Sequence, residues 1–222
     1  MSRRETRVSI AETVTSNPVS AFLRSISAHR THVGLISLSD CFDRSPPPPL
    51  PALELQDIRL LLLIGLPGSG KSSLAAALLH CCPQRSLIST DAIRSQLFGD
   101  EAIQGNWLQV WREVGRQLQQ ATRQITTGQS LEAIYDATNA VRRDRRRAIA
   151  LARSCGFTNI ICVWLNTPLD VCLQRNEQRD RQVPDTVILK MHRCLMGAPP
   201  AMGEGCDRVL EIRTCTQQDE GF

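Results

Sequence analysis

The most constraining feature of this 222-residue chain is the segment Gly65-Leu-Pro-Gly-Ser-Gly-Lys-Ser72, which matches the pattern GxxxxGK[ST]. The segment follows an apolar run at residues 58–64 and precedes an Ala- and Leu-rich stretch at residues 73–79. Glycines let successive backbone N–H groups turn toward an anion, and the start of a helix adds its dipole and its unpaired N–H groups. The pattern therefore predicts a phosphate-binding loop between a buried strand and a helix.

The loop predicts a site for a nucleoside triphosphate and a divalent cation. We expect Lys71 to reach the β- and γ-phosphates and the Ser72 hydroxyl to be a Mg²⁺ ligand. Lys71 and Lys190 are the only lysines of the chain, and the position of one of them within the pattern argues against a chance match. ATP and Mg²⁺ are thus the expected cofactors. The predicted nucleotide contacts from the loop are Gly65, Pro67, Gly68, Ser69, Gly70, Lys71, Ser72 and Ser73.

Strand-like and helix-like patterns alternate from residue 58 onward. Strands are predicted at residues 58–64, 86–89, 131–135, 160–165 and 208–212, and helices at residues 71–80, 106–127, 141–154, 169–180 and 184–196. Strands that are apolar throughout are typical of a parallel sheet covered by helices on both faces. The sequence therefore predicts an α/β fold.

Residues 1–57 have a different composition, rich in Ser, Thr and Pro, and contain Ser45-Pro-Pro-Pro-Pro-Leu-Pro51. Successive prolines favour the polyproline II conformation and are incompatible with the interior of a sheet. We expect residues 1–57 to form a poorly ordered N-terminal extension with a Pro-rich linker. Within it, only residues 19–26 and 33–38 have weak helix-like and strand-like patterns. The folded domain is expected at residues 58–222.

Charge and cysteine content limit the partners and the compartment. A net charge of +4 does not oppose a nucleic-acid partner and does not require one. The nine cysteines include no CxxC pair, and the four histidines lack zinc-ligand spacing, so we expect reduced thiols and a cytoplasmic protein. The longest strongly apolar run, residues 60–66, is too short to cross a bilayer, so no membrane partner is expected. The sequence does not indicate an oligomeric state.

Asp91 and Arg94 follow the second predicted strand. Because ligands bind at the carboxyl ends of parallel strands, Asp91 is expected to face the γ-phosphate, where a carboxylate can accept a proton from an acceptor hydroxyl. Arg94 lies one helical turn further on and is placed to hold a substrate phosphate. The alternative is that Asp91 only caps a helix.

Asp136 ends the third predicted strand and is placed to hold the Mg²⁺ shell through water. The alternative role for Asp136 is a cap or a turn, and Asn139 would cap the next helix or reach the acceptor. An arginine cluster follows, with Arg142, Arg143, Arg145, Arg146 and Arg147 at the start of that helix. The cluster is either a solvated face or a grip for a polyanion.

Arg175 and Arg179 are four residues apart and are expected to share one face of a helix. A mobile segment that carries them would close over ATP and supply an arginine to the transferring phosphoryl group. The alternative is that they form surface ion pairs with Glu177 and Asp180.

The ordered set Gly65–Ser72, Asp91-x-x-Arg94, Asp136-Ala-Thr-Asn139 and Arg175-Asn-x-x-Arg179 resembles the kinase domain of phage-type polynucleotide 5′-hydroxyl kinases. This branch of P-loop kinases is often labelled AAA-family ATPase. The resemblance covers about residues 58–213. It implies a five-stranded, mostly parallel sheet in the order 2-3-1-4-5 with a helical lid, Asp91 as general base and Arg94 as a substrate-phosphate contact. It also implies that Arg175 and Arg179 belong to the lid over ATP.

The expected function is ATP- and Mg²⁺-dependent transfer of a phosphoryl group to a hydroxyl, with a polynucleotide 5′ end as one acceptor. Three alternatives remain open at this point. The chain could be a kinase of a metabolite, nucleoside or antibiotic, which the scarcity of acceptor-site aromatic residues favours slightly. It could also be a regulatory ATP-binding module with slow hydrolysis, or a toxin-like kinase.

Overall fold

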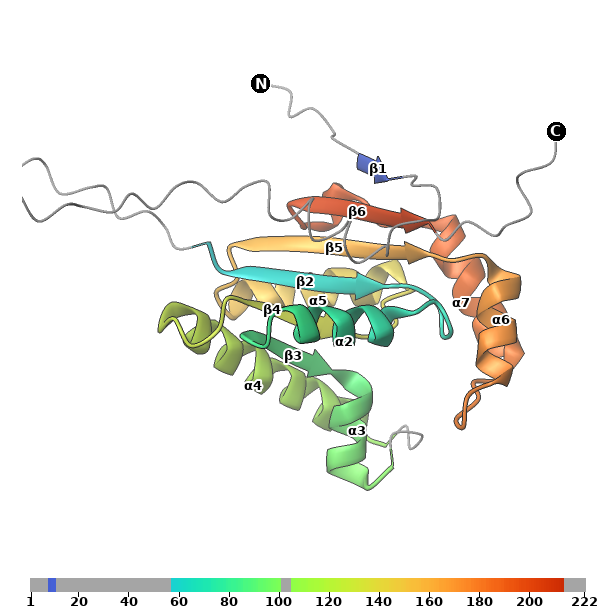
Figure 1. Cartoon of the computed structure of the whole chain (residues 1–222), viewed down its shortest axis with the longest axis horizontal. Helices are drawn as coiled ribbons and strands as arrows, with labels where there is room; N and C mark the ends of the chain where they lie inside the picture. The colour runs from blue at the N-terminus through green and yellow to red at the C-terminus, as the bar shows by residue number, and fades with distance from the viewer. Residues whose placement is uncertain (1–7, 11–56, 101–104, 214–222) are drawn as a thin grey trace, which may run out of the picture.

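The computed structural model describes residues 8–10, 57–100 and 105–213. Its centre is a parallel sheet whose strands all point the same way (Figure 1). The strands are β1 (Val8–Ile10), β2 (Arg59–Ile64), β3 (Arg85–Ser89), β4 (Glu132–Asp136), β5 (Asn159–Asn166) and β6 (Arg208–Arg213). They lie in the order β1-β6-β5-β2-β4-β3.

The predicted five-stranded sheet is confirmed, because β3-β4-β2-β5-β6 is the order 2-3-1-4-5 of the five predicted strands. Every neighbouring pair is parallel. The chain crosses from one side of β2 to the other between β4 and β5. Such a switch point leaves a crevice at the carboxyl ends of the central strands, where ligands bind in open α/β sheets.

The strand β1 was not predicted. Its backbone pairs with β6 in the register Val8↔Leu210 to Ile10↔Ile212 and adds a sixth strand at the edge of the sheet. The sequence pattern placed these residues in a poorly ordered extension. The Pro-rich segment and the two weak patterns at residues 19–26 and 33–38 lie outside the described residues.

The helices of the described regions are α2 (Lys71–Cys81), α3 (Thr90–Phe98), α4 (Trp107–Thr126), α5 (Arg142–Ser154), α6 (Leu169–Glu177) and α7 (Asp185–Gly197), with a short 3₁₀ turn, η1 (Met202–Glu204). Helix α2 covers one face of the sheet, and α4 and α5 cover the other (Figure 1). The five predicted helices agree with the structure to within one or two residues at nearly every boundary. The exception is the carboxyl end of α6, which is shorter than predicted.

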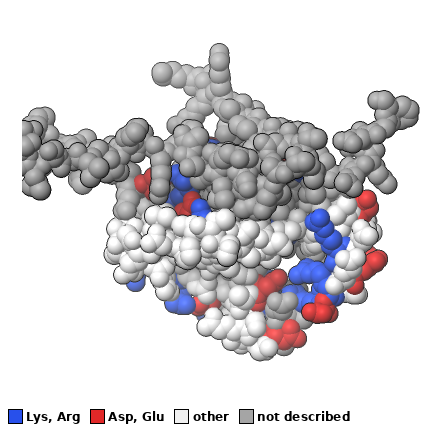
Figure 2. All heavy atoms as spheres, in the orientation of Figure 1, with Lys and Arg blue, Asp and Glu red and all other residues white. Residues whose placement is uncertain are grey.

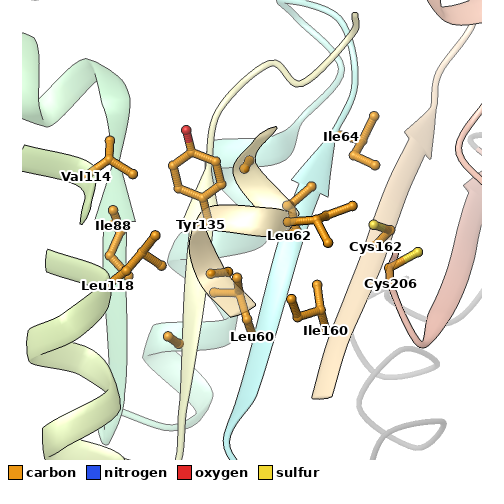
Figure 3. Packing of buried hydrophobic residues seen from close by; sticks show 14 of the residues in the cluster. Leu60, Leu62, Ile64, Ile88, Val114, Leu118, Tyr135, Ile160, Cys162 and Cys206 are labelled. Carbon is orange, nitrogen blue, oxygen red and sulfur yellow. The ribbon is translucent and has the colours of Figure 1, made fainter. Parts of the chain in front are cut away.

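The apolar run of β2 is buried on both sides because its side chains alternate between two cores. Leu60, Leu62 and Ile64 pack with residues of α4 and of the neighbouring strands (Figure 3). Leu61 and Leu63 point the other way and pack against Leu74, Ala75 and Leu78 of α2. This burial fixes the carboxyl end of β2, and with it the start of the glycine-rich loop.

Candidate functional site

The glycine-rich loop joins the buried end of β2 to the first turn of α2. The Ser69 N–H donates to the Leu66 carbonyl at 3.1 Å, which closes the turn. Gly68 has a φ of 81°, and a Cβ atom there would clash with the carbonyl of Cys172 in α6. The Thr167 hydroxyl donates to the Ser69 carbonyl at 3.0 Å. Neighbouring elements therefore hold the loop main chain in place, and only glycine fits at position 68.

Lys71 is buried at the start of α2, and the two hydrogen bonds that its ammonium group makes with described residues are to the loop itself. Its Nζ donates to the Leu66 carbonyl at 2.7 Å and lies 3.4 Å from the Ser69 Oγ. Burial lowers the pKa of Lys71 to about 8, although the Asp136 carboxylate acts in the opposite direction. The charged form is therefore costly to keep here, and an anion bound at the loop would compensate it.

Ser72 and Asp136 bring two oxygen ligands together at the base of the site. The Ser72 hydroxyl donates to Asp136 Oδ2 at 2.8 Å, so the end of β4 meets the first turn of α2. Burial raises the pKa of Asp136, while the hydrogen bond from Ser72 and the charge of Lys71 oppose that rise. Asp136 ends β4 and does not cap α5, because the N-cap residue of α5 is Val141, whose side chain forms no capping hydrogen bond.

This donor set fits Mg²⁺, which takes hard oxygen ligands, keeps several waters and uses one or two carboxylates together with substrate phosphates. Within the described residues, no group of three or more His, Cys, Asp or Glu side chains is positioned to hold a metal without such a co-ligand. Ser72 and Asp136 would therefore hold the ion jointly with a phosphate.

Asp91 stands on the other wall of the site, in the first turn of α3. Arg94 NH1 lies 2.6 Å from Asp91 Oδ1, and Arg181 NH1 lies 3.7 Å from Asp91 Oδ2. Asp91 does not cap α3, because Ser89 is the capping residue and its hydroxyl accepts a hydrogen bond from the Ala92 N–H at 3.4 Å. Its carboxylate is 45% exposed. Asp91 is thus oriented by two arginines and open to the cavity.

The prediction that Arg175 and Arg179 share a helix face is wrong. Helix α6 ends at Glu177, so Arg179 lies in the connection to α7. Asn176 causes this end: its amide donates to the Val183 carbonyl at 2.8 Å, and its carbonyl oxygen accepts from the Val183 N–H at 3.0 Å. These two bonds fold residues 177–183 back over the site.

Arg175 and Arg179 nevertheless reach the same cavity. In the described part of the chain, neither forms an ion pair with Glu177 or Asp180, so the surface-pair alternative has no support there.

One cavity of about 610 Å³ joins these groups. Figure 2 shows basic and acidic side chains gathered on the right-hand side of the molecule, in the region between α3 and α6. The residues that line the cavity are Pro67, Gly68, Gly70, Lys71, Ser72, Ser73, Thr90, Asp91, Arg94, Asp136, Ala137, Thr138, Arg175, Arg179, Arg181, Val183, Val187 and Met191. Gly65 and Ser69 belong to the loop but do not line this cavity. Arg181, Val183, Val187 and Met191 were not predicted, because they join the site only through the way the chain turns between α6 and α7. Thr138 was not assigned a role either, although it lies two residues after Asp136.

The arginine cluster at the start of α5 is divided by the fold. Arg142, Arg143, Arg146 and Arg147 are exposed, and none of them lines the cavity. Arg145 is fully buried and forms two hydrogen bonds, of 2.8 and 2.6 Å, with the Glu204 carboxylate.

Arg145 and Glu204 form a brace between two loops near the site. Arg145 also donates to the carbonyls of Asn139 at 3.3 Å, Ala140 at 3.0 Å and Ala198 at 2.6 Å. Asn139 itself adopts a φ of 49° and donates to the Leu63 carbonyl at 2.7 Å, so it neither caps α5 nor lines the cavity. The Arg145–Glu204 brace therefore ties the loop after β4 to the end of α7.

No helix in residues 8–10, 57–100 and 105–213 is long and apolar enough to cross a membrane. The seven cysteines of these regions are free thiols.

Comparison with protein families gives a match to AAA_33, described as an AAA domain, over residues 60–196. Among curated proteins, L-seryl-tRNA(Sec) kinase of Methanococcus maripaludis is 28% identical over 141 residues. The match covers 60% of this chain and 51% of that protein, so the chain spans about half the length of this relative.

Three solved structures have similar folds. A chain of the Pnkp1/Rnl/Hen1 RNA repair complex has a TM-score of 0.53 at 19% identity, over 64% of this chain and 45% of that one. A candidate kinase of Chloroflexus aurantiacus has a TM-score of 0.53 at 18% identity, over 74% and 92% of the two chains. A fungal RNA kinase has a TM-score of 0.50 at 16% identity, over 73% and 40%. At these identities the likeness concerns the fold alone.

Proposed function

Because the chain belongs to the AAA_33 family of P-loop kinase domains, we propose that it transfers the γ-phosphoryl group of ATP to a hydroxyl acceptor, with a polynucleotide 5′-hydroxyl as the preferred acceptor. The proposal rests on the observation that the glycine-rich loop and a second group of charged side chains line the same cavity. Lys71 and Ser72 line one wall, and Asp91 and Arg94 line the other. A nucleotide site alone does not need the second wall. In this proposal residues 58–222 form the kinase domain, and residues 1–57 form an extension that contributes β1.

The triphosphate is held by the main chain of the loop and by Lys71. Backbone N–H groups at the start of α2 point toward the bound anion, and the Lys71 ammonium neutralises the β- and γ-phosphates. Ser72 and Asp136 hold the Mg²⁺ that accompanies ATP, which screens the charge of the phosphates. Binding of the anion also relieves the cost of burying Lys71, whose pKa is lowered to about 8 in its absence.

Asp91 activates the acceptor by taking the proton of its hydroxyl group. The acceptor oxygen then forms a bond to the γ-phosphorus, the bond from that phosphorus to the β,γ-bridging oxygen breaks, and ADP departs with the electron pair. Arg94 holds the Asp91 carboxylate at 2.6 Å and thereby fixes its direction. Arg175 and Arg179 face the transferring group from the lid and stabilise its charge.

The names of the relatives support an acceptor that is part of a nucleic acid. The curated relative is a kinase of L-seryl-tRNA(Sec), and two of the similar solved structures come from RNA repair and RNA kinase proteins.

The direct test is a panel of hydroxyl acceptors incubated with ATP labelled in the γ-position. The panel contains 5′-hydroxyl DNA and RNA oligonucleotides, seryl-tRNA, free nucleosides and hydroxylated antibiotics. We expect label transfer to the 5′-hydroxyl oligonucleotides, and no transfer when Lys71 is replaced by Ala. Transfer only to a small acceptor would overturn the preferred acceptor, and ATP binding without transfer to any acceptor would overturn the kinase proposal itself.

A further inference from the structure

Trp107 is unusually exposed for so large an apolar side chain. It is the first residue of α4, where Asn106 caps the helix by accepting the Leu108 N–H at 2.9 Å, and its side chain is 48% exposed. Its ring stacks on Trp111, one helical turn along, with centroids 5.9 Å apart and planes at 29°. By contrast, Trp164 in β5 is buried. The Trp107 indole is therefore held by the Trp111 ring, while about half of its surface stays exposed to solvent.

Arg94 connects this indole to the cavity. Its guanidinium carbon lies 5.8 Å from the centre of the Trp107 ring, and its NH1 holds Asp91 at 2.6 Å. Arg94 lines the cavity and Trp107 does not, so the indole lies outside the cavity, next to a residue of the wall that carries Asp91. The Arg94 Nε atom is buried and, within the described residues, has no hydrogen-bond partner. The buried Nε is out of reach of a ligand, so a phosphate would meet the NH1 and NH2 groups of this guanidinium, whose side chain is 13% exposed.

We propose that Trp107 forms a stacking platform for one nucleobase of the acceptor, next to Arg94, for which the family resemblance already implies a substrate-phosphate contact. The inference rests on the proposed function and adds a contact for one base to its polynucleotide acceptor. The three groups on this wall are a carboxylate for a hydroxyl, a guanidinium for an anion and an open indole for a planar ring. A nucleotide carries a hydroxyl, a phosphate and a base within the same short span.

The indole is the group that distinguishes this acceptor from others. Base–aromatic stacking contributes to the binding of single-stranded nucleic acids without sequence preference, because every base has a π-face. Arginine beside the ring adds a cation that attracts both the phosphate and the ring system. A sugar or an amino-acid acceptor would engage Asp91 and leave the Trp107 ring in water. The platform therefore favours a nucleobase over the other hydroxyl acceptors.

The test compares two 5′-hydroxyl oligonucleotides that differ only in their two 5′-terminal nucleotides. One oligonucleotide carries normal bases at these positions, and the other has abasic sites there. Four proteins are assayed for kcat and KM: wild type, Trp107→Ala, Trp107→Phe and Leu108→Ala. Leu108 is the matched control, because it is the next residue of the same helix and is 53% exposed, whereas the aromatic contact with Arg94 is made by Trp107. A nucleoside 3′-phosphate serves as a third acceptor, to separate a free nucleotide from a polymer.

The expected result is selective for the base. Trp107→Ala raises KM for the normal oligonucleotide by about tenfold, while the abasic acceptor is already weak and changes little. Trp107→Phe restores most of the affinity because it keeps an aromatic ring, and Leu108→Ala behaves as wild type. In a binding assay without ATP, the normal oligonucleotide quenches tryptophan fluorescence of the wild type, and this quenching is reduced in Trp107→Phe.

The outcomes separate the two proposals. If the wild type transfers phosphate to no acceptor, the proposed function fails. If transfer occurs but Trp107→Ala affects both oligonucleotides equally, or affects neither, the platform is overturned while the kinase remains. If Trp107→Ala does not fold, Trp107→Phe and the fluorescence titration still decide: an unchanged wild-type signal on addition of the normal oligonucleotide contradicts the platform.

Discussion

The two walls of the cavity are built in different ways. The wall formed by the glycine-rich loop is held by main-chain contacts, such as the 3.1 Å bond from the Ser69 N–H to Leu66 and the 3.0 Å bond from the Thr167 hydroxyl to the Ser69 carbonyl. The opposite wall is held by charged side chains, with Arg94 and Arg181 on either side of Asp91. A main-chain wall fits any triphosphate, whereas a side-chain wall determines what else can enter.

Lys71 in the main-chain wall is also more deeply buried than Asp91 in the side-chain wall. Lys71 is 9% exposed and depends on its neighbours for compensation of its charge, while the Asp91 carboxylate is 45% exposed. The main-chain wall is therefore closely packed. The side-chain wall is more open to solvent, so its side chains have more room to move.

The largest effect on stability is expected at the Arg145–Glu204 brace, which ties the loop after β4 to the end of α7. Glu204→Gln leaves the buried Arg145 guanidinium without its charge partner, and we expect the free energy of unfolding to fall by about 3–5 kcal/mol. Urea denaturation measures this loss. Glu113→Gln is the control, since the Glu113–Arg116 pair of 2.7 Å lies at the surface and its loss should be much smaller. Equal losses in the two variants would show that the brace has no structural role.

The second effect concerns the main-chain wall alone. Gly68→Ala forces an L-residue to a φ of 81° and drives its Cβ into the Cys172 carbonyl, so we expect ATP affinity to fall by more than about 100-fold. Isothermal titration calorimetry with ATP and Mg²⁺ measures it. Gly128→Ala is the control: Gly128 has a φ of 73° but open space around it, so it shares the backbone strain without the clash. ATP affinity equal to wild type in Gly68→Ala would contradict the described loop.

A smaller effect is expected on the lid side of the side-chain wall. Arg179→Ala removes a cation that lines the cavity from the α6–α7 connection, and we expect kcat to fall roughly tenfold to 100-fold. Steady-state kinetics at saturating ATP measures it, with Arg147→Ala as the control because Arg147 is exposed on α5 outside the cavity. If both variants keep the wild-type kcat, Arg179 does not act on the transferring group.

The main-chain wall was predictable from the sequence, and the side-chain wall only in part. The loop pattern is local: a buried strand, glycines at fixed spacing and a helix start specify Gly65–Ser72 without reference to the rest of the chain. The parallel direction of the strands followed from their continuous apolar runs, and their order in the sheet followed from the family resemblance. Asp91 was found because it lies just beyond the end of a strand, and Asp136 was found because it is the last residue of one.

The rest depends on contacts that sequence spacing does not encode. Arg145 belongs to the same sequence cluster as four exposed arginines. It is buried because the fold brings it to Glu204, which lies 59 residues further along the chain. Arg179 lies beyond the end of α6 because Asn176 binds Val183, which is a single pair of hydrogen bonds. Trp107 lies beside Arg94 through the packing of α4 on α3, which the spacing of these two residues in the sequence does not indicate.

In the proposed mechanism, the Asp91 carboxylate takes the proton of the acceptor hydroxyl. The most direct measurement is single-turnover phosphoryl transfer by Asp91→Asn, with ATP affinity measured on the same protein. The control is Asp144→Asn, because Asp144 lies in the first turn of α5 as Asp91 lies in the first turn of α3. We expect the rate of Asp91→Asn to be lower by about 10²–10⁴-fold, with ATP affinity close to wild type, and the control to be unaffected. A wild-type rate in Asp91→Asn would contradict it.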